Sequence, residues 1–178
     1  MAGQMLIEPV PAASVLVLRE NPFEILMLRR NDNSSFVPGA WVFPGGVAEE
    51  SDGGDLRVTA VRETFEEAGV KLEPDALVWT SRWITPVGLP KRFDTYFYLA
   101  KVGRNVTVTI DNAEIADAMW IAPADALTRR DLKLVFPTVK NLEAIAGSAS
   151  VDALLESRRG AVIEAIEPVL VNGKPTLR

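Results

Sequence analysis

The feature that most restricts the fold is the order in which strand-like runs and helix-like stretches follow one another. Short runs of branched and apolar residues, bounded by turn signals such as Asn21-Pro22, are typical of strands. The predicted strands cover residues 13–20, 23–30, 41–43, 76–85, 92–102, 106–110 and 116–122, and the predicted helices cover 55–69, 123–130, 136–146 and 151–159. This mixed order predicts an α/β domain with a mixed sheet between helical layers.

The chain length and its last residues complete this prediction. At 178 residues the chain is long enough for one well-packed domain, so we expect a single domain over residues 1–178. The dipeptide Asn172-Gly173 is a hairpin signal and predicts a terminal β-ribbon at about residues 162–178. Because an isolated two-stranded hairpin is marginal in water, we expect this ribbon to contribute to a homodimer interface.

Composition and charge exclude several classes of function. A net charge of -5 and an isoelectric point near 4.9 argue against nucleic acid or an anionic membrane as partner, and favour a small-molecule substrate. No apolar run approaches the roughly 18 residues of a membrane helix, and no basic segment precedes an apolar one at the start, so we expect a cytoplasmic location. With no cysteine and no histidine, enzyme chemistry must come mostly from carboxylates, lysine, tyrosine or an oxygen-bound metal ion.

The predicted helix at residues 55–69 carries an unusual group of charges. At about 100° per residue, its three glutamates share one face, opposite an apolar stripe that we expect to pack on the sheet. Asp55 is the expected N-cap, and Gly69 is the expected left-handed C-cap. The glutamates are Glu63, Glu66 and Glu67, and the stripe is Val58, Val61, Phe65 and Ala68.

Like charges at this spacing cost a helix roughly 0.2–0.5 kcal/mol per pair, unless a cation offsets their repulsion. Mg²⁺ would do so, because it prefers carboxylate oxygens and water, often completed by substrate phosphates. The alternative is an ordinary solvated helix face. Two glycines upstream, Gly45 and Gly46 in the run WVFPGG, favour the metal, since they let the backbone approach a metal ion or a phosphate closely.

The runs FPGG and RETFEEAGV together resemble the Nudix box, which ends in R-E-U-x-E-E-x-G-U with U an apolar residue. Every position of this second half matches except the first U, where Thr64 stands. The first half departs from the pattern: its glutamate would fall on Gly54, and the loop from Gly46 is two residues too long. The candidates to replace that glutamate are Glu49, Glu50, Asp52 and Asp55.

The resemblance implies a Nudix-type α/β/α sandwich and hydrolysis of a nucleoside diphosphate linked to another group. It implies metal ligation by the Gly46 carbonyl, Glu63, Glu66 and Glu67, with Mg²⁺ as the ion and Mn²⁺ as an alternative. It also implies that Arg62 orients these carboxylates by salt bridges. For the general base, Glu114 in the run NAEIADAMW lies where many members carry a late glutamate. The alternatives are that Glu67 is the base, or that Glu114 is a solvated loop residue.

Cations near the expected cleft are candidates to bind substrate phosphates. They are Arg29, Arg30, Lys91 and Arg92, with the backbone of Gly45 as a further contact, although strand-end arginines often remain in solvent. Aromatic residues that would stack on a base, or lie in the core, are Phe36, Trp41, Trp83 and Tyr96. The signature of coenzyme A hydrolases is met only in part, because Asn31 and Ser35 replace two of its residues; Pro86 has a spacing resembling that of ADP-ribose hydrolases.

Two rival interpretations remain at the level of sequence. The first is a catalytically silent Nudix domain that acts as a nucleotide-ligand sensor or a protein-interaction module, which the altered first half of the box supports. The second is a structural α/β protein with a merely acidic helix. The intact Glu63, Glu66 and Glu67 favour the enzyme, and magnesium-dependent activity would separate it from both rivals.

Overall fold

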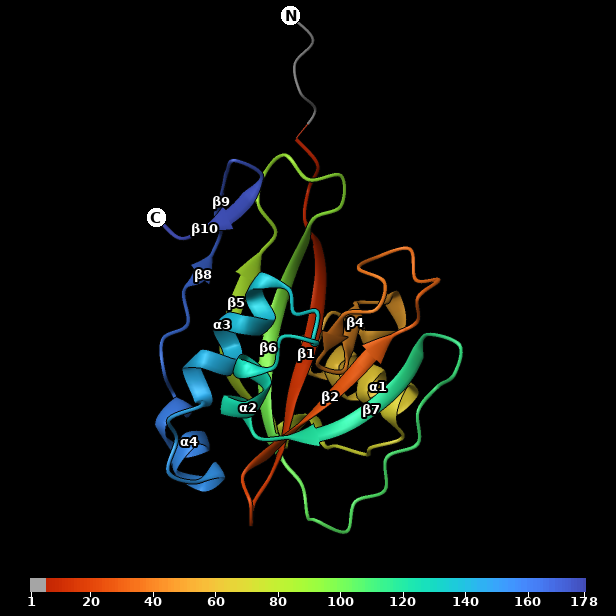
Figure 1. Cartoon of the computed structure of the whole chain (residues 1–178), viewed down its shortest axis with the longest axis vertical. Helices are drawn as coiled ribbons and strands as arrows, with labels where there is room; N and C mark the ends of the chain where they lie inside the picture. Colours follow the sequence, from red (N-terminus) through yellow and green to blue (C-terminus); the bar gives the residue numbers. More distant parts are fainter. Residues whose placement is uncertain (1–5) are drawn as a thin grey trace, which may run out of the picture.

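A mixed sheet forms the centre of the computed structural model, which describes residues 6–178 (Figure 1). Its strand order is β3-β2-β1-β6-β5-β8, with β4 paired to β1 and β7 paired to β2. β1 runs parallel to β6 and antiparallel to β2, which confirms the predicted mixed sheet. The strands are β1 (Val10–Arg19), β2 (Glu24–Arg30), β3 (Trp41–Val42), β4 (Gly45–Val47), β5 (Val78–Ile84), β6 (Phe93–Lys101), β7 (Ile115–Ile121) and β8 (Ala165–Ile166).

Helices cover both faces of this sheet, as Figure 1 shows with α1 on one side and α2, α3 and α4 on the other. Side chains of β1 alternate between the two cores: Leu16 packs with Leu142 of α3, and Val17 packs with Ala60 of α1. A strand buried on both faces reads as a continuous apolar run. The α/β/α sandwich is therefore confirmed. The helices are α1 (Leu56–Ala68), α2 (Pro123–Thr128), α3 (Phe136–Ile145), α4 (Val151–Arg158) and the short 3-10 helices η1 (Glu50–Asp52) and η2 (Pro74–Ala76).

Residues 106–110 were the one predicted strand that the structure does not contain. Their alternating apolar side chains instead pack against the core beneath α1. Their backbone continues to the end of that helix, where Thr109 N–H donates to the Ala68 carbonyl and Asp111 N–H donates to the Glu67 carbonyl. The segment thus satisfies carbonyl groups that a helix C-terminus otherwise leaves unpaired.

The run WVFPGG contains the predicted short strand as β3, and its two glycines begin a further strand that was not predicted. β3 ends at Val42, and Gly45–Val47 form β4, antiparallel to β1. Gly45 has to be a glycine here, since a Cβ on it would lie 2.4 Å from the Ala13 carbonyl oxygen. The close approach of β4 to β1 places this glycine pair directly beside α1, where α1 and β4 contact each other.

The C-terminal ribbon is confirmed. β9 (Val169–Val171) and β10 (Lys174–Thr176) pair antiparallel around Asn172 and Gly173, which have φ angles of 51° and 76°. The preceding strand β8 joins the main sheet parallel to β5. Within residues 6–178, no helix is long and apolar enough to cross a membrane.

Candidate active site

The helix α1 begins and ends as predicted. Asp55 accepts a hydrogen bond from Arg57 N–H at its N-terminus, and Gly69, with a φ of 67°, donates to the Phe65 carbonyl at its C-terminus. The predicted apolar stripe is wrong at Phe65, which is 49% exposed, whereas Ala68 is buried and Val61 packs against the core. The buried face consists of small or short side chains together with one glutamate: Thr59, Ala60, Thr64, Glu67 and Ala68.

The close approach of β4 to α1 explains this choice of face. At Gly46, an added Cβ would lie 2.4 Å from a carboxylate oxygen of Glu63, so a larger residue there would displace the Glu63 carboxylate from its place against β4. A face of alanine and threonine lets the two backbones approach, whereas Phe65 on that face would hold them apart. Glu63 and Glu67 consequently pack against β4, whereas Glu66 stays largely in solvent.

The three glutamates differ in exposure. Glu67 is only 4% exposed, and one of its carboxylate oxygens accepts a hydrogen bond of 3.0 Å from Gly45 N–H. The Glu63 side chain is 15% exposed, and the Glu66 side chain is 53% exposed. The face that the three glutamates share thus runs from a buried carboxylate to a solvated one.

Burial raises the pKa of Glu67 to about 8, and the nearby charge of Glu63 adds to this effect. Burial also raises the pKa of Glu63, although the Arg62 guanidinium works in the opposite direction. Two desolvated carboxylates in one place favour a proton or a cation between them. A hard divalent cation fits this donor set of carboxylate oxygens and a glycine backbone.

Arg62 forms ion pairs with four acidic side chains around α1, which are Glu49, Asp52, Glu63 and Glu66. Its Nη1 lies 3.0 Å from Glu63 Oε1 and 3.3 Å from Glu66 Oε2, and its Nη2 donates to the Val47 carbonyl. These contacts match the orienting role that the resemblance implies. Among residues 6–178, no three acidic side chains converge closely enough to hold a metal ion by themselves. An ion at this site would need further oxygen ligands, such as the Gly46 carbonyl, water or substrate phosphates.

Among the four candidates to replace the missing first glutamate, Asp52 is the one that is buried against Arg62. Its side chain is 2% exposed and accepts two hydrogen bonds from Arg62, at 2.8 Å from Nε and 2.9 Å from Nη2. Thr59 Oγ1 and Glu49 N–H donate to it as well. The Arg62 guanidinium holds the pKa of Asp52 well below its usual range. The longer loop is accommodated by η1, and sequence alone could not choose Asp52 from the four acidic residues in this region.

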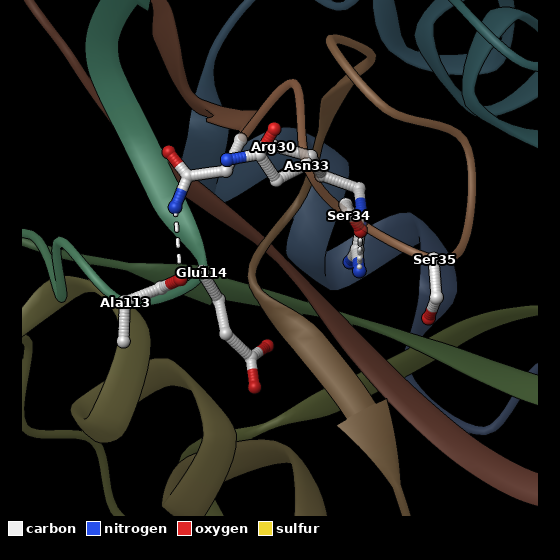
Figure 2. A pocket seen from close by; sticks show the side chains of 7 residues that line it. Arg30, Asn33, Ser34, Ser35, Ala113 and Glu114 are labelled. Carbon is white, nitrogen blue, oxygen red and sulfur yellow. Dashed lines mark hydrogen bonds between the residues drawn. The ribbon is translucent and has the colours of Figure 1, made fainter.

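Glu114 lies at a separate rim of the site. It helps to line a cavity of about 210 Å³, in which the loop after β2 faces the loop before β7. Figure 2 shows Ser34 and Ser35 on one side of this cavity and Glu114 on the other. The charge of Glu114 is the smallest of the contributions that raise the pKa of Glu63 and of Glu67, so its carboxylate faces the same region of the site from the cavity rim.

The four candidate phosphate-binding cations are not gathered at one place. Arg30 lines the cavity, where its Nε and Nη2 donate to Ser34 Oγ, and Arg29 forms an ion pair of 2.6 Å with Asp32. Neither Lys91 nor Arg92 lines the cavity. Lys91 is exposed in the loop between β5 and β6.

Arg92 is a structural residue in this fold, contrary to the prediction. Its side chain is 8% exposed and donates to the carbonyls of Thr85 and Ile7, and it pairs with Glu167 before the C-terminal ribbon. A buried guanidinium whose donors are used in this way is not available to a substrate.

The four aromatic residues that were candidates for stacking on a base lie in different environments. Trp41 and Trp83 lie in the core beneath α2, α3 and α4. Tyr96 is stacked on Trp79, with ring centroids 5.1 Å apart. Phe36, in the loop after the cavity residues, is 39% exposed and contacts Phe93 edge to face.

Comparison with known proteins shows which family the chain belongs to. The family profile described as NUDIX domain matches residues 8–141. A Caenorhabditis elegans protein that carries the name nudix hydrolase 7 is 30% identical over 154 residues, which cover 65% of this chain and 52% of the relative. The peroxisomal coenzyme A diphosphatase ndx-8 of the same organism is 37% identical over 118 residues, which cover 61% of this chain and 47% of the relative. The chain thus spans about half the length of these relatives.

Solved structures show the same fold. A NUDIX hydrolase from Alicyclobacillus acidocaldarius superposes with a TM-score of 0.77 at 27% sequence identity, over 84% of this chain and 96% of the other. The profile match covers well over half of the chain and includes β4, α1 and the loop that carries Glu114. The chain belongs to the Nudix family.

Proposed function

We propose that this protein is a Mg²⁺-dependent hydrolase that cleaves the pyrophosphate of a nucleoside diphosphate linked to another group. The observation that carries the proposal is the pair of buried carboxylates, Glu63 and Glu67, packed against the glycine backbone of β4. Burial makes both costly to ionise without a cation. Mn²⁺ is the alternative ion, because its oxygen-ligand preference is similar.

In this proposal Glu63, Glu66, Glu67 and the Gly46 carbonyl hold the ion. A bound divalent ion would neutralise phosphate charge and acidify a bound water. Arg62 keeps Glu63 and Glu66 in place through the ion pairs of its Nη1. Asp52 holds the guanidinium itself by accepting hydrogen bonds from Nε and Nη2. The precision of the site thus depends on a network that reaches from η1 to the middle of α1.

Glu114 is the proposed general base that takes the proton from the attacking water. It is exposed at the rim of the cavity, the chain contains no histidine, and its charge is felt by both buried glutamates. Glu67 is the alternative base. It is less suited, because its carboxylate is buried and already accepts a hydrogen bond from Gly45 N–H.

We propose that the substrate is a nucleoside diphosphate derivative of the coenzyme A or ADP-ribose type. We also propose that the protein acts in the cytoplasm. The similarity to a coenzyme A diphosphatase supports the first type, and the polar lining of the cavity by Asn33, Ser34 and Ser35 supports a hydroxyl-rich group. Arg30, which lines the same cavity, is the proposed partner of a substrate phosphate.

The test is to incubate the protein and Mg²⁺ with coenzyme A, ADP-ribose, NADH and dinucleoside polyphosphates, and to identify products by mass. We expect chelation with EDTA to abolish turnover. We expect Glu67→Gln and Glu66→Gln to lower kcat by at least about a hundredfold, which corresponds to roughly 2.7 kcal/mol of transition-state stabilisation. Glu156→Gln, an exposed carboxylate on α4, is the matched control and should not change kcat.

Near-normal turnover in both glutamine variants would reject the metal site. If ADP-ribose binds by calorimetry but no compound is cleaved with either Mg²⁺ or Mn²⁺, the silent sensor replaces the enzyme.

A further inference from the structure

The loop of residues 111–114, which carries Glu114 into β7, is fastened to α1 at one end. Asp111 N–H donates to the Glu67 carbonyl at 3.0 Å, so the loop is bonded to the backbone of a proposed metal ligand. Within the loop, Ala113 N–H donates to the Asp111 carboxylate and Ile115 N–H donates to the Asp111 carbonyl, both at 2.9 Å. These bonds make the turn compact, but they do not hold the carbonyl groups of residues 112–114.

Asn31, the residue that follows β2, binds these carbonyl groups. Its backbone N–H donates to the Glu114 carbonyl at 2.9 Å. Its side-chain Nδ2 donates to the Ala113 carbonyl at 2.8 Å and to the Asn112 carbonyl at 3.2 Å. One residue therefore binds three successive carbonyl groups of the loop.

The regular strand pairing cannot replace these bonds. β2 and β7 pair with a register shift between Arg29 and Arg30, where the partner changes from Asp117 to Ile115. A bulge leaves the adjoining backbone without a regular ladder to define its position. The segment that carries Glu114 begins at this irregularity, so its position depends on Asn31.

We infer that Asn31 is a positioning residue, whose side-chain amide sets where the Glu114 carboxylate stands relative to Glu63 and Glu67. Figure 2 shows Ala113 and Glu114 together at the cavity rim, with a hydrogen bond drawn to the loop. The inference rests on the proposed function, because positioning matters for catalysis only if Glu114 takes the proton. It extends that function to a residue outside the Nudix box.

The test compares Asn31→Leu with wild type. Leucine keeps the number and branching of the side-chain heavy atoms and leaves the backbone N–H bond to Glu114 intact, but it removes the amide donor of both side-chain bonds. We expect kcat to fall about tenfold to a hundredfold with KM nearly unchanged, because a displacement of about 1 Å at a catalytic group has an effect of this size. Asn112→Ala is the matched control on the same loop, since only its backbone carbonyl is used, and it should leave kcat unchanged.

A double variant separates positioning from general destabilisation. If Asn31 acts through Glu114, then Asn31→Leu in the Glu114→Gln background should cause no further loss of kcat. A full additional loss in that background, or an unchanged kcat in Asn31→Leu alone, would overturn the inference.

Hydrogen–deuterium exchange gives a readout that needs no turnover. We expect the amides of residues 112–115 to exchange faster in Asn31→Leu, and at the wild-type rate in Asn112→Ala. Unchanged exchange in Asn31→Leu would overturn the positioning role even in an active enzyme. Because this measurement requires no substrate, rejection of the hydrolase activity and rejection of the Asn31 role are distinguishable.

Discussion

Replacement of Asp52 should destabilise the fold more than any other change to an acidic residue in the loop between β4 and α1. Asp52→Ala removes four hydrogen bonds at once, two of them to the Arg62 guanidinium. Loss of one partner of a buried ion pair costs about 3–5 kcal/mol. Arg62 keeps Glu63 and Glu66 as partners, so we expect a loss of about 3 kcal/mol, the lower end of this range.

Asp52→Asn provides a finer test, because it keeps the shape of the side chain. An asparagine oriented to accept from Arg62 Nη2, Thr59 and Glu49 N–H turns its own amide group toward Arg62 Nε–H. One charge-assisted hydrogen bond is lost and the others become weaker. We expect a loss of about 2 kcal/mol in the free energy of unfolding, which lowers the urea midpoint by about 1 M.

The pH dependence of this difference has a definite sign. The pKa of Asp52 is lowered in the folded protein by Arg62, so its ionisation stabilises the fold above the ordinary aspartate pKa, and this stabilisation is lost as pH falls toward the folded value. The difference in stability between wild type and Asp52→Asn should therefore be full at neutral pH and should shrink below about pH 4.

Urea unfolding, followed by tryptophan fluorescence at several pH values, measures both effects. Glu50→Gln is the matched control, because Glu50 is an exposed carboxylate in the same turn and should change the urea midpoint little. Equal midpoints for wild type and Asp52→Asn at neutral pH would refute the assignment of Asp52 as the partner of Arg62. A difference that grows as the pH falls would refute the electrostatic explanation.

Two further predictions concern the base and the C-terminal ribbon. Glu114→Gln should reduce kcat strongly with little change in KM. Asp111→Asn should retain most activity, because its amide oxygen can still accept from Ala113 N–H. The opposite ranking of kcat would show that the base is misplaced. A chain that ends at Glu167 keeps the ion pair with Arg92 but lacks β9 and β10, and light scattering should find it monomeric where the full chain is dimeric; the same mass for both chains would reject the dimer role of the ribbon.

Features that depend on neighbouring residues could be predicted from the sequence. The caps at Asp55 and Gly69 and the hairpin at Asn172-Gly173 follow from local backbone preferences, and all three are present in the structure. The run that carries Glu63, Glu66 and Glu67 identified the helix and the family for the same reason.

Features that depend on distant segments could not be predicted in this way. The buried face of α1 is chosen by the close approach of β4, so the apolar pattern led to Phe65, which is exposed. Arg92 is used by Glu167, which lies 75 positions away, and Asn31 bonds to a loop more than 80 positions away. No local sequence pattern predicts such partners, because each of these contacts exists only after the sheet has formed.

The parallel pairing of β1 with β6 has a consequence for synthesis. Residues Val10 to Leu18 of β1 pair with Phe93 to Lys101 of β6. The well-buried β1 is therefore synthesised before its partner β6, and the two can pair in full only when residue 101 has left the ribosome. Pairing between segments so far apart in the chain is slow compared with local contacts, and unpaired apolar strands are prone to aggregation in the interval. During translation the β1–β2 hairpin can form early, but both faces of β1 await α1 and α3, and its second edge awaits β6. The central strand β1 is therefore among the first parts of the sheet to be synthesised and among the last to be fully packed.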